Sequence, residues 1–441
     1  MLPKKEVKKR KEFQLVKGMK DILPEEQRYW DFARSLVDRL ARQYGFKKIE
    51  TPILEFSDLF VRAVGQTTDI VEKEMYAFTD QGDDHLALRP EGTAGVVRAY
   101  LEHGLQTLPQ PVKLFYFGPM FRRDNPQAGR FRQHWQFGFE VIGETDAIID
   151  AQIILIAYKF YQAINLPVSL QINSIGCLSC RPVFENELKD YLKKRKSKLS
   201  IISQERLFKN PLRILDSKEK EDQPIIAEAP QQIDFLCEEC KNHFIQVLEY
   251  LDELEVPYAL NSSIVRGLDY YSRTTFEIWT QKEEGRQSAL GGGGRYDGLV
   301  SLLGGLETPA IGFACGVERF INQIKETDFK VPEEARPEIF LAQLGAAARK
   351  KSVLLFEELT KAGLKVVENF SKSGLKPQLE IADKLKVKFT LILGQKEIID
   401  GTIMIRDMEN GIQEVVDFGK TIPEIKKRLE KSVVNDQPEK V

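Results

Sequence analysis

Long apolar runs are absent from this 441-residue sequence, and cysteine, histidine and tryptophan are scarce, with five, four and three copies. No run approaches the ~20 apolar residues that a membrane-spanning helix needs, so we expect no membrane partner. The basic stretch 1–12 has no apolar segment behind it, which argues against a secretory signal and for a frayed tail. These absences together predict a cytosolic protein.

An excess of either charge is also lacking, because 64 Lys and Arg side chains face 66 Asp and Glu side chains. A net charge of −2 would not attract nucleic acid, so any nucleic acid must be bound by local basic patches. Hydrophobic residues make up 42% and charged residues 29% of the chain, as in a globular protein. The length predicts two or three domains.

Four of the five cysteines form two CxxC pairs, Cys177 with Cys180 and Cys237 with Cys240. Four thiolates in two such pairs can close a tetrahedral zinc site. The pairs are separated by residues 181–236, which is more than a usual zinc ribbon allows. Two interpretations stay open, a structural zinc ion or four free thiols in a reducing compartment, and disulfides are disfavoured.

Between residues 115 and 140 the sequence predicts a strand, a loop and a second strand. The side chains of the second strand alternate between two faces. The expected polar face holds Arg130, Arg132, His134, Gln136, Gly138 and Glu140, and the expected buried face holds Phe131, Trp135, Phe137 and Phe139. Gly138 leaves space for a ligand against the backbone. With arginines at the mouth of the hairpin, this face suits a ligand that carries phosphate and a small polar group. A solvated hairpin with scattered charge is the alternative.

Other elements follow from periodicity and from turn residues. We expect helices over 25–45, 94–103, 146–164 and 316–324, with Thr93 as the N-cap of the second. We expect strands over 47–53, 86–89, 168–173 and 274–279 and near Gly291, while residues 310–315 are small and apolar. Residues 177–258 are rich in lysine and glutamate and predict an inserted, mainly helical module. After a proline-bounded linker at 330–337, strands and helices alternate over 338–431, which predicts a compact α/β domain with a partly parallel sheet.

Five segments carry a resemblance to a known family. They are Arg89-Pro-Glu-Gly-Thr93, Phe121-Arg122, Arg266-Gly-Leu-Asp-Tyr-Tyr271, Leu290-Gly-Gly-Gly-Gly-Arg-Tyr-Asp297 and the stretch from Pro309 to Phe320. Together they resemble the histidyl-tRNA synthetases, a class II aminoacyl-tRNA synthetase family, over nearly the whole chain. The third and fourth segments are specific to the histidine enzymes of that class.

The resemblance implies an α+β fold with a class II antiparallel catalytic sheet, flanking helices, a mainly helical insertion and a C-terminal α/β anticodon-binding domain. The implied bounds are a tail at 1–12, a catalytic domain at 13–329 with its insertion at 177–258, the linker 330–337, the anticodon-binding domain 338–431 and a tail at 432–441. It also implies a homodimer, built partly through the segment around Pro52.

The implied reaction joins L-histidine to ATP, releases pyrophosphate, and then transfers histidine to the 3′ end of tRNA(His). The attacking carboxylate and the α-phosphate are both anionic, so fixed cations lower the barrier. Arginine suits this task because its fork stays charged and binds phosphate oxygens bidentately. By resemblance, Arg122 and Arg266 contact the α-phosphate from two sides and Arg319 the γ-phosphate, with Mg²⁺ on the outer phosphates.

Histidine recognition is likewise assigned by resemblance. Glu91 and Gln136 are implied at the α-amino group with Thr93 beside them, Glu140 and Tyr271 at the two ring nitrogens, and Tyr270 and Tyr296 nearby. His134 departs from the family, which usually has phenylalanine where the adenine stacks; its flat ring preserves stacking. In the hairpin loop, Gln127 is implied as the reader of the extra 5′ guanosine of tRNA(His), and the C-terminal domain as the reader of unstacked anticodon bases.

Two rivals are weighed against this interpretation. The first is a catalytically inactive paralogue, the histidine-sensing regulatory subunit of ATP phosphoribosyltransferase, which lacks the anticodon domain and usually loses the phosphate-binding arginines. This chain keeps Arg122, Arg266, Arg319 and residues 338–431. The second rival, a class II synthetase for proline or threonine, is disfavoured by the 266–271 segment and by Glu140.

Overall fold

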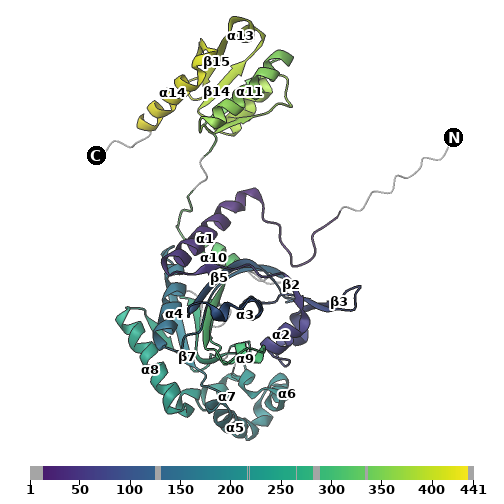
Figure 1. Cartoon of the computed structure of the whole chain (residues 1–441), viewed down its shortest axis with the longest axis vertical. Coiled ribbons are helices and arrows are strands. Elements are labelled where there is room, and N and C mark those ends of the chain that lie inside the picture. Colours follow the sequence, from purple (N-terminus) through teal and green to yellow (C-terminus); the bar gives the residue numbers. More distant parts are fainter. Residues whose placement is uncertain are drawn as a thin grey trace, which may run out of the picture. The chain divides into compact units, whose positions relative to one another are not determined.

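A computed structural model describes residues 13–124, 131–215, 217, 219–264, 266–281, 289–332 and 336–435, the last four without side chains. The chain divides into two compact units between Val331 and Pro332 (Figure 1). This division lies within the stretch 330–337, where we expect a linker. Among the helices described, none is both long enough and apolar enough to cross a bilayer.

The first unit is built on an eight-stranded sheet in the order β1-β5-β6-β11-β10-β9-β7-β8. Only the outermost pairs, β1 with β5 and β7 with β8, are parallel, so the sheet is antiparallel through its centre, as class II resemblance implies. The strands are β1 (Lys47–Lys48), β5 (Val112–Phe121), β6 (Gln133–Ile142), β11 (Ala310–Gly316), β10 (Ala289–Arg295), β9 (Ser272–Thr280), β7 (Val168–Ser174) and β8 (Tyr258–Leu260).

One face of this sheet packs against helices. Phe137 and Phe139 of β6 belong to a core that also contains the apolar sides of α1 (Pro24–Gln43), α4 (Ala147–Gln162) and α10 (Val317–Glu326). Helix α1 buries Trp30, Ala33, Val37 and Leu40, whose spacing of three or four residues forms one stripe. Asp146 caps α4 by accepting a hydrogen bond from the Ile148 N–H at 2.9 Å.

The other face carries a second core and the polar side of β6. Tyr116 of β5, Tyr270, Tyr271 and Tyr296 pack there with residues of α2 (Ser57–Val64), α3 (Thr93–Glu102) and α9 (Leu299–Leu302). A small antiparallel sheet adjoins this region in the order β2-β4-β3. Its strands are β2 (Leu54–Phe56), β4 (His85–Leu88) and β3 (Tyr76–Thr79), and a short π-helix precedes β3 at Ile70–Glu74.

Two expectations about element ends are wrong. The strand expected over 47–53 is only Lys47–Lys48, and pairing resumes in β2 after Pro52, which has no N–H to donate to a ladder. Thr93 is the first residue of α3 and not its N-cap. The Glu91 carboxylate accepts the N–H groups of Thr93 at 2.7 Å and Ala94 at 2.9 Å, so it satisfies the start of the helix from two residues upstream.

Between β7 and β8 the chain forms the helical module expected from its composition. Its helices are α5 (Cys180–Lys193), α6 (Ile201–Lys209), α7 (Gln223–Ala227) and α8 (Glu238–Glu253), with a 3-10 turn at Pro211–Ile214. Phe184, Leu188, Leu192, Leu207 and Ile214 give the module a core of its own. Helix α8 instead packs Val247 and Leu251 into the main core.

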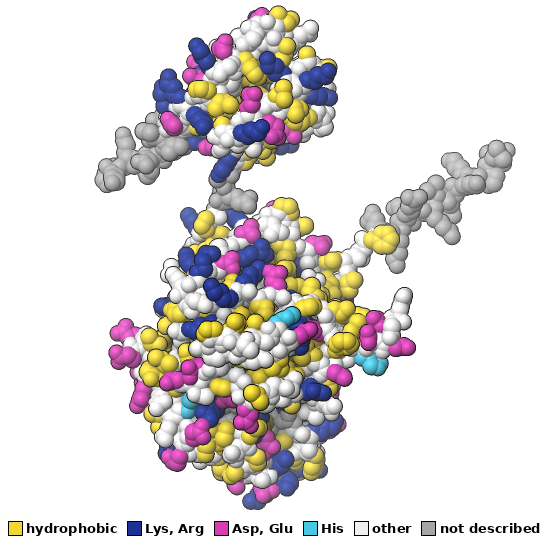
Figure 2. Space-filling model, in the orientation of Figure 1, with side chains coloured by type: hydrophobic (Ala, Val, Ile, Leu, Met, Phe, Trp, Pro, Cys, Tyr) yellow, Lys and Arg dark blue, Asp and Glu magenta, His cyan; other side chains and the backbone are white. Residues whose placement is uncertain are grey.

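The second unit has a five-stranded sheet in the order β13-β12-β14-β15-β16, parallel in its first three strands and antiparallel in the rest. Its strands are β12 (Ile339–Gln343), β13 (Val366–Glu368), β14 (Phe389–Leu393), β15 (Thr402–Asp407) and β16 (Gln413–Asp417), and its helices are α11 (Ala346–Lys361), α12 (Leu375–Lys384), α13 (Gln395–Asp400) and α14 (Thr421–Asn435). Two separate apolar clusters make this unit's core. On the face drawn in Figure 2, basic and acidic side chains are interspersed over both units.

Candidate active site

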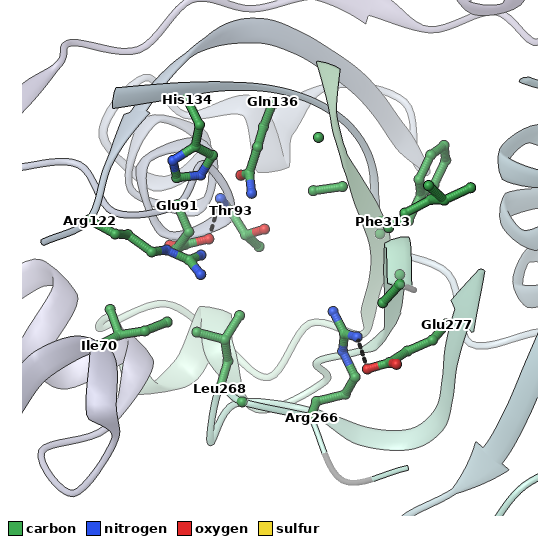
Figure 3. A pocket seen from close by; sticks show the side chains of 18 of the residues that line it. Ile70, Glu91, Thr93, Arg122, His134, Gln136, Arg266, Leu268, Glu277 and Phe313 are labelled. Carbon is green, nitrogen blue, oxygen red and sulfur yellow. Dashed lines mark hydrogen bonds and ion pairs between the residues drawn. The ribbon is translucent and has the colours of Figure 1, made fainter. Parts of the chain in front are cut away.

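A cavity of about 400 Å³ opens over the polar side of β6, between that strand, β10, β11, the start of α3 and the 266–271 loop. Arg122, Arg266 and Arg319 all line it, although they are far apart in the chain. Figure 3 shows the guanidinium groups of Arg122 and Arg266 directed into the same space from two sides. Three fixed cations on one cavity match the charge of a triphosphate.

Backbone carbonyls and a carboxylate hold the three arginines. Arg122 follows β5, and its Nε donates to the Pro90 carbonyl oxygen at 2.8 Å. Arg319 lies on α10 and donates to the Ala289 carbonyl oxygen of β10. Arg266 donates from Nη1 to Glu277 Oε1 at 2.7 Å, and its guanidinium carbon lies 5.4 Å from the centre of the Tyr271 ring.

Glycine in β10 makes room for Arg266. A Cβ on Gly292 would lie 2.5 Å from the Phe276 carbonyl oxygen and 2.8 Å from Arg266 Nη1. Burial lowers the pKa of Arg266, but Tyr271 and Glu277 outweigh that effect and raise it on balance. Gly292 therefore lies in a strand within the sheet, where its close neighbours are a backbone carbonyl and an arginine.

A buried hydrogen-bond network closes one end of the cavity. Thr93 Oγ1 donates to Glu140 Oε1 at 2.8 Å, and the Tyr296 hydroxyl donates to Glu140 Oε2 at 2.5 Å. Thr93 and Tyr296 line the cavity, whereas Glu140, 1% exposed, lies behind them. The Tyr270 hydroxyl donates to Glu91 Oε2 at 3.5 Å, so the two buried carboxylates each have hydroxyl partners on the cavity wall.

Burial sets the protonation of this network. Desolvation raises the pKa of Glu140 to about 8 against the effect of its two hydroxyl donors. Desolvation also raises the pKa of Glu91. Both carboxyl groups therefore lie where a cationic or hydrogen-donating ligand would stabilise their charged forms. These carboxylate acceptors suit a small molecule with an ammonium and ring N–H groups.

The remaining implied contacts also reach the cavity. His134, Gln136, Tyr270 and Tyr271 line it, and Figure 3 shows His134 and Gln136 extending from one strand toward the same space. Burial, and then the nearby Arg122 charge, lower the pKa of His134 to about 3, so its ring is neutral at pH 7. The rings of Tyr270 and Tyr271 lie 4.7 Å apart between centroids, and the pair forms an aromatic wall.

Two details of the hairpin differ from the parity prediction. Phe131 lines the cavity and does not join the buried face, because β6 begins only at Gln133 and alternation does not extend before it. The space above Gly138 is not open to a ligand. A Cβ there would lie 2.4 Å from the Tyr116 hydroxyl, so the tyrosine ring fills it. Gln127 and Arg130 lie outside the described residues.

Sequence reasoning missed several side chains at the site. Tyr116, Glu277 and Glu318 line the cavity without a role assigned to them. Glu318 accepts the Trp135 N–H at 2.9 Å, and burial raises the pKa of Glu318 to about 7. The alternation of Glu277 with buried Phe276 and Ile278 is the one signal that could have placed it on the cavity face.

Apart from this cavity, the four CxxC cysteines meet in the helical module. All four Sγ atoms lie within 4.8 Å of one another, with Cys177 to Cys180 at 3.4 Å and Cys180 to Cys240 at 3.6 Å. All are free of disulfides. A tetrahedron with Zn–S bonds of about 2.3 Å has S–S edges of roughly 3.8 Å, so this arrangement fits a tetrathiolate site. Cys180 begins α5 and Cys237 precedes α8, so the two pairs reach the cluster from the starts of two helices.

Comparison with known proteins gives consistent matches. The family description "Histidyl-tRNA synthetase" matches residues 18–320, and "Anticodon binding domain" matches residues 338–428. A histidine–tRNA ligase of Dehalococcoides mccartyi is 47% identical over 418 residues, covering 95% of this chain and 100% of that protein. One from Desulforamulus reducens is 46% identical over 413 residues, covering 93% and 98%.

Solved structures agree in fold. The apo histidyl-tRNA synthetase of S. aureus has a TM-score of 0.78 and 35% identity, over 94% of this chain and 99% of that one. A Bacillus halodurans protein described as an ATP phosphoribosyltransferase regulatory subunit/histidyl-tRNA synthetase has a TM-score of 0.62 but 19% identity, over 87% and 99%, which reflects fold alone. The anticodon-binding-domain match over residues 338–428 disfavours the regulatory alternative, because the resemblance implies that such paralogues lack this domain.

Proposed function

Because the chain belongs to the histidyl-tRNA synthetase family and has the activity of a histidine–tRNA ligase, we propose that the cavity over β6 binds histidine and ATP side by side. The observation that supports this most is the convergence of Arg122, Arg266 and Arg319 on a cavity whose end carries two buried carboxylates. The end of the cavity with the arginines suits phosphate groups, and the end with the carboxylates suits an amine and a ring that carries N–H groups.

In the first step, the histidine carboxylate attacks the α-phosphorus, a P–O bond forms, and the bond to pyrophosphate breaks. Arg122 and Arg266 are proposed to contact the α-phosphate from opposite sides and Arg319 the γ-phosphate. Arg266 cannot lose its proton here, so it offsets the charge of the attacking carboxylate throughout the step. The neutral ring of His134 is proposed to stack on adenine.

Histidine is proposed to bind with its ammonium at Glu91, Gln136 and Thr93. Tyr271 is assigned to one ring nitrogen and Glu140 to the other, with Tyr270 and Tyr296 enclosing the ring. Glu140 lies behind the Thr93 and Tyr296 hydroxyls, so this contact requires the ring to enter between them. Each Glu140 oxygen already accepts one hydroxyl hydrogen bond, and a carboxylate oxygen can accept a second. A side chain without ring N–H groups would leave these buried groups unpaired, which rejects it strongly.

Magnesium is expected on the outer phosphates of ATP. Two of the lining carboxylates, Glu277 and Glu318, already have partners in Arg266 and the Trp135 N–H. Mg²⁺ keeps most of its waters and binds chiefly to phosphate oxygens in such sites. These residues fit an ion carried by the nucleotide better than an all-protein cage.

In the second step, histidine passes to the 3′ end of tRNA(His). Gln127 is proposed to read the extra 5′ guanosine, and residues 338–431 the anticodon. We also propose that the protein is a homodimer with contacts around Pro52, and that it acts in the cytoplasm.

The cysteine cluster is proposed to bind one structural Zn²⁺ through Cys177, Cys180, Cys237 and Cys240. The support is the approach of four sulfur atoms from two separate CxxC pairs to near-tetrahedral spacing. Metal analysis of the purified chain should find about one zinc per chain, and Cys180→Ser should lower that number to near zero. Less than half an equivalent in the unaltered protein would contradict the proposal.

The test of the catalytic proposal is exchange of radioactive pyrophosphate into ATP. Exchange should require L-histidine and fail with proline or threonine. Arg266→Ala should slow exchange by at least about 100-fold, because a fixed charge at the transition state is lost. Arg62→Ala, on the surface of α2 and outside the cavity lining, is the control and should leave the rate within twofold. Histidine binding without any exchange would favour the regulatory alternative.

A further inference from the structure

The 266–271 loop carries three of the groups assigned to substrate, Arg266, Tyr270 and Tyr271, yet it belongs to no helix or strand. It connects β8 to β9, so something other than sheet pairing must fix its backbone. One contact comes from the catalytic unit's own helix α2, whose Val64 carbonyl accepts the Asp269 N–H at 3.1 Å. Gly65 adjoins it, and a Cβ there would lie 2.1 Å from the Asp269 carboxylate.

Among the described residues, the helical module supplies the hydrogen bonds to this loop's carbonyl groups. Arg181 donates from Nη2 to the Tyr271 carbonyl oxygen at 2.5 Å and from Nη1 to that of Asp269 at 3.5 Å. Arg213 donates from Nη2 to the Gly267 carbonyl oxygen at 2.7 Å. Two charged side chains of the module thus donate hydrogen bonds to three carbonyl groups of this six-residue loop.

Both arginines are themselves fixed within the module. Arg181 directly follows Cys180, and its N–H donates to the Cys177 carbonyl oxygen at 3.0 Å, so it is tied to the cysteine cluster. Its Nε is buried. Arg213 lies in the 3-10 turn Pro211–Ile214, and Ile214 is part of the module's core. Their positions therefore depend on the folding of the module.

We propose that Arg181 and Arg213 are positioning residues for histidine binding, and that the helical module completes the amino-acid site by fixing the 266–271 loop. This inference rests on the proposed function, because it takes the loop as the part that contacts histidine. Neither arginine lines the cavity, so both act through the loop backbone. Loss of either loosens the loop. The cost falls mainly on histidine, which the loop contacts through its tyrosines, because the Arg266 guanidinium that faces ATP is held separately by Glu277 of β9.

The test is steady-state pyrophosphate exchange with histidine and ATP varied separately. Arg181→Ala should raise the KM for histidine by about tenfold and change the KM for ATP less than threefold. Arg213→Ala should act in the same direction, and the double variant more strongly than either. Arg181→Lys, which keeps one charged donor, should recover part of the histidine affinity.

Arg195→Ala is the matched control. Arg195 lies in the same module, but it donates to the Tyr191 carbonyl oxygen and not to the loop. Its guanidinium carbon lies 3.8 Å from the centre of the Tyr191 ring. It should leave both KM values unchanged. An unchanged KM for histidine in a folded Arg181→Ala protein, or an equal rise in both KM values, would overturn the inference. Absence of exchange in the unaltered protein would instead contradict the proposed function.

Discussion

At the residue scale, burial of Glu140 predicts a dependence of stability on pH. Its pKa is raised from 4.5 to about 8 in the folded protein, so between these values the folded state holds a proton that the unfolded state has lost. Stability therefore falls as pH rises from about 4.5 to about 8. The effect should be on the order of a few kcal/mol, because one pKa unit corresponds to about 1.4 kcal/mol.

Chemical unfolding at pH 5 and at pH 8 measures this loss. Glu140→Gln keeps the shape and removes the titration, so its free energy of unfolding should fall less between the two pH values. Glu187→Gln, an exposed change on α5, should behave as the unaltered protein does. An equal pH dependence in the Glu140→Gln protein would mean that other buried carboxyl groups, such as Glu318 and Asp150, account for the trend.

Residue chemistry and resemblance grouped the three arginines, and all three line one cavity, but neither could predict how deeply each side chain would be buried. Parity places His134, Gln136 and Glu140 on one face, and this holds in β6. The alternation along one strand cannot show that Glu140 lies behind Thr93 and Tyr296, because these residues belong to other segments, the start of α3 and the residue that follows β10. Nor can it show that the ring of Tyr116, directly opposite on β5, fills the space at Gly138.

At the scale of the element, β10 carries a prediction about close packing. Gly292→Ala would place a Cβ 2.5 Å from the Phe276 carbonyl oxygen and 2.8 Å from Arg266 Nη1. We expect about 1–3 kcal/mol of destabilisation from this overpacking, and at least about tenfold slower exchange because Arg266 shifts. Thermal unfolding and the exchange rate measure the two effects.

A nearby glycine offers the matched control. Gly298 precedes α9, and a Cβ there has nothing within 4 Å. Gly298→Ala should leave stability within about 0.5 kcal/mol and the exchange rate unchanged. If both substitutions behaved alike, the requirement for glycine in β10 would not lie in its contacts with β9 and Arg266.

Elements with strong periodicity were predictable, and their ends were less so. The stripe of Trp30, Ala33, Val37 and Leu40 marks α1 clearly, whereas the start of α3 depends on a carboxylate two residues upstream that no local pattern distinguishes from Thr93. The two CxxC pairs suggested a zinc site, but the length of chain between them left four free thiols as an alternative. They meet because Cys177 follows β7 and Cys237 precedes α8, which packs beside α4.

At the scale of the whole molecule, the separate cores of the two units predict separable activities. The first unit contains the entire cavity, and the second has its own apolar clusters. A chain ending at Val331 should therefore keep histidine-dependent exchange within about threefold. It should lose most aminoacylation of tRNA(His), because the proposed anticodon contacts are gone.

Parallel assays of exchange and of tRNA charging on the shortened and full-length chains decide this. Loss of both activities in a shortened chain that still unfolds cooperatively would show that adenylation needs residues beyond 331. Full charging by the shortened chain would remove the C-terminal unit from tRNA recognition.

The ring of Tyr116 lies against two glycines from other segments of the chain, Gly92 and Gly138. A Cβ on Gly92 would lie 2.4 Å from its Cζ atom, and a Cβ on Gly138 would lie equally close to the same atom from the neighbouring strand. Neither glycine can acquire a side chain while the tyrosine stays. A homologue with alanine at either position should therefore also carry a smaller side chain in place of the tyrosine, so these three positions are expected to vary together or not at all.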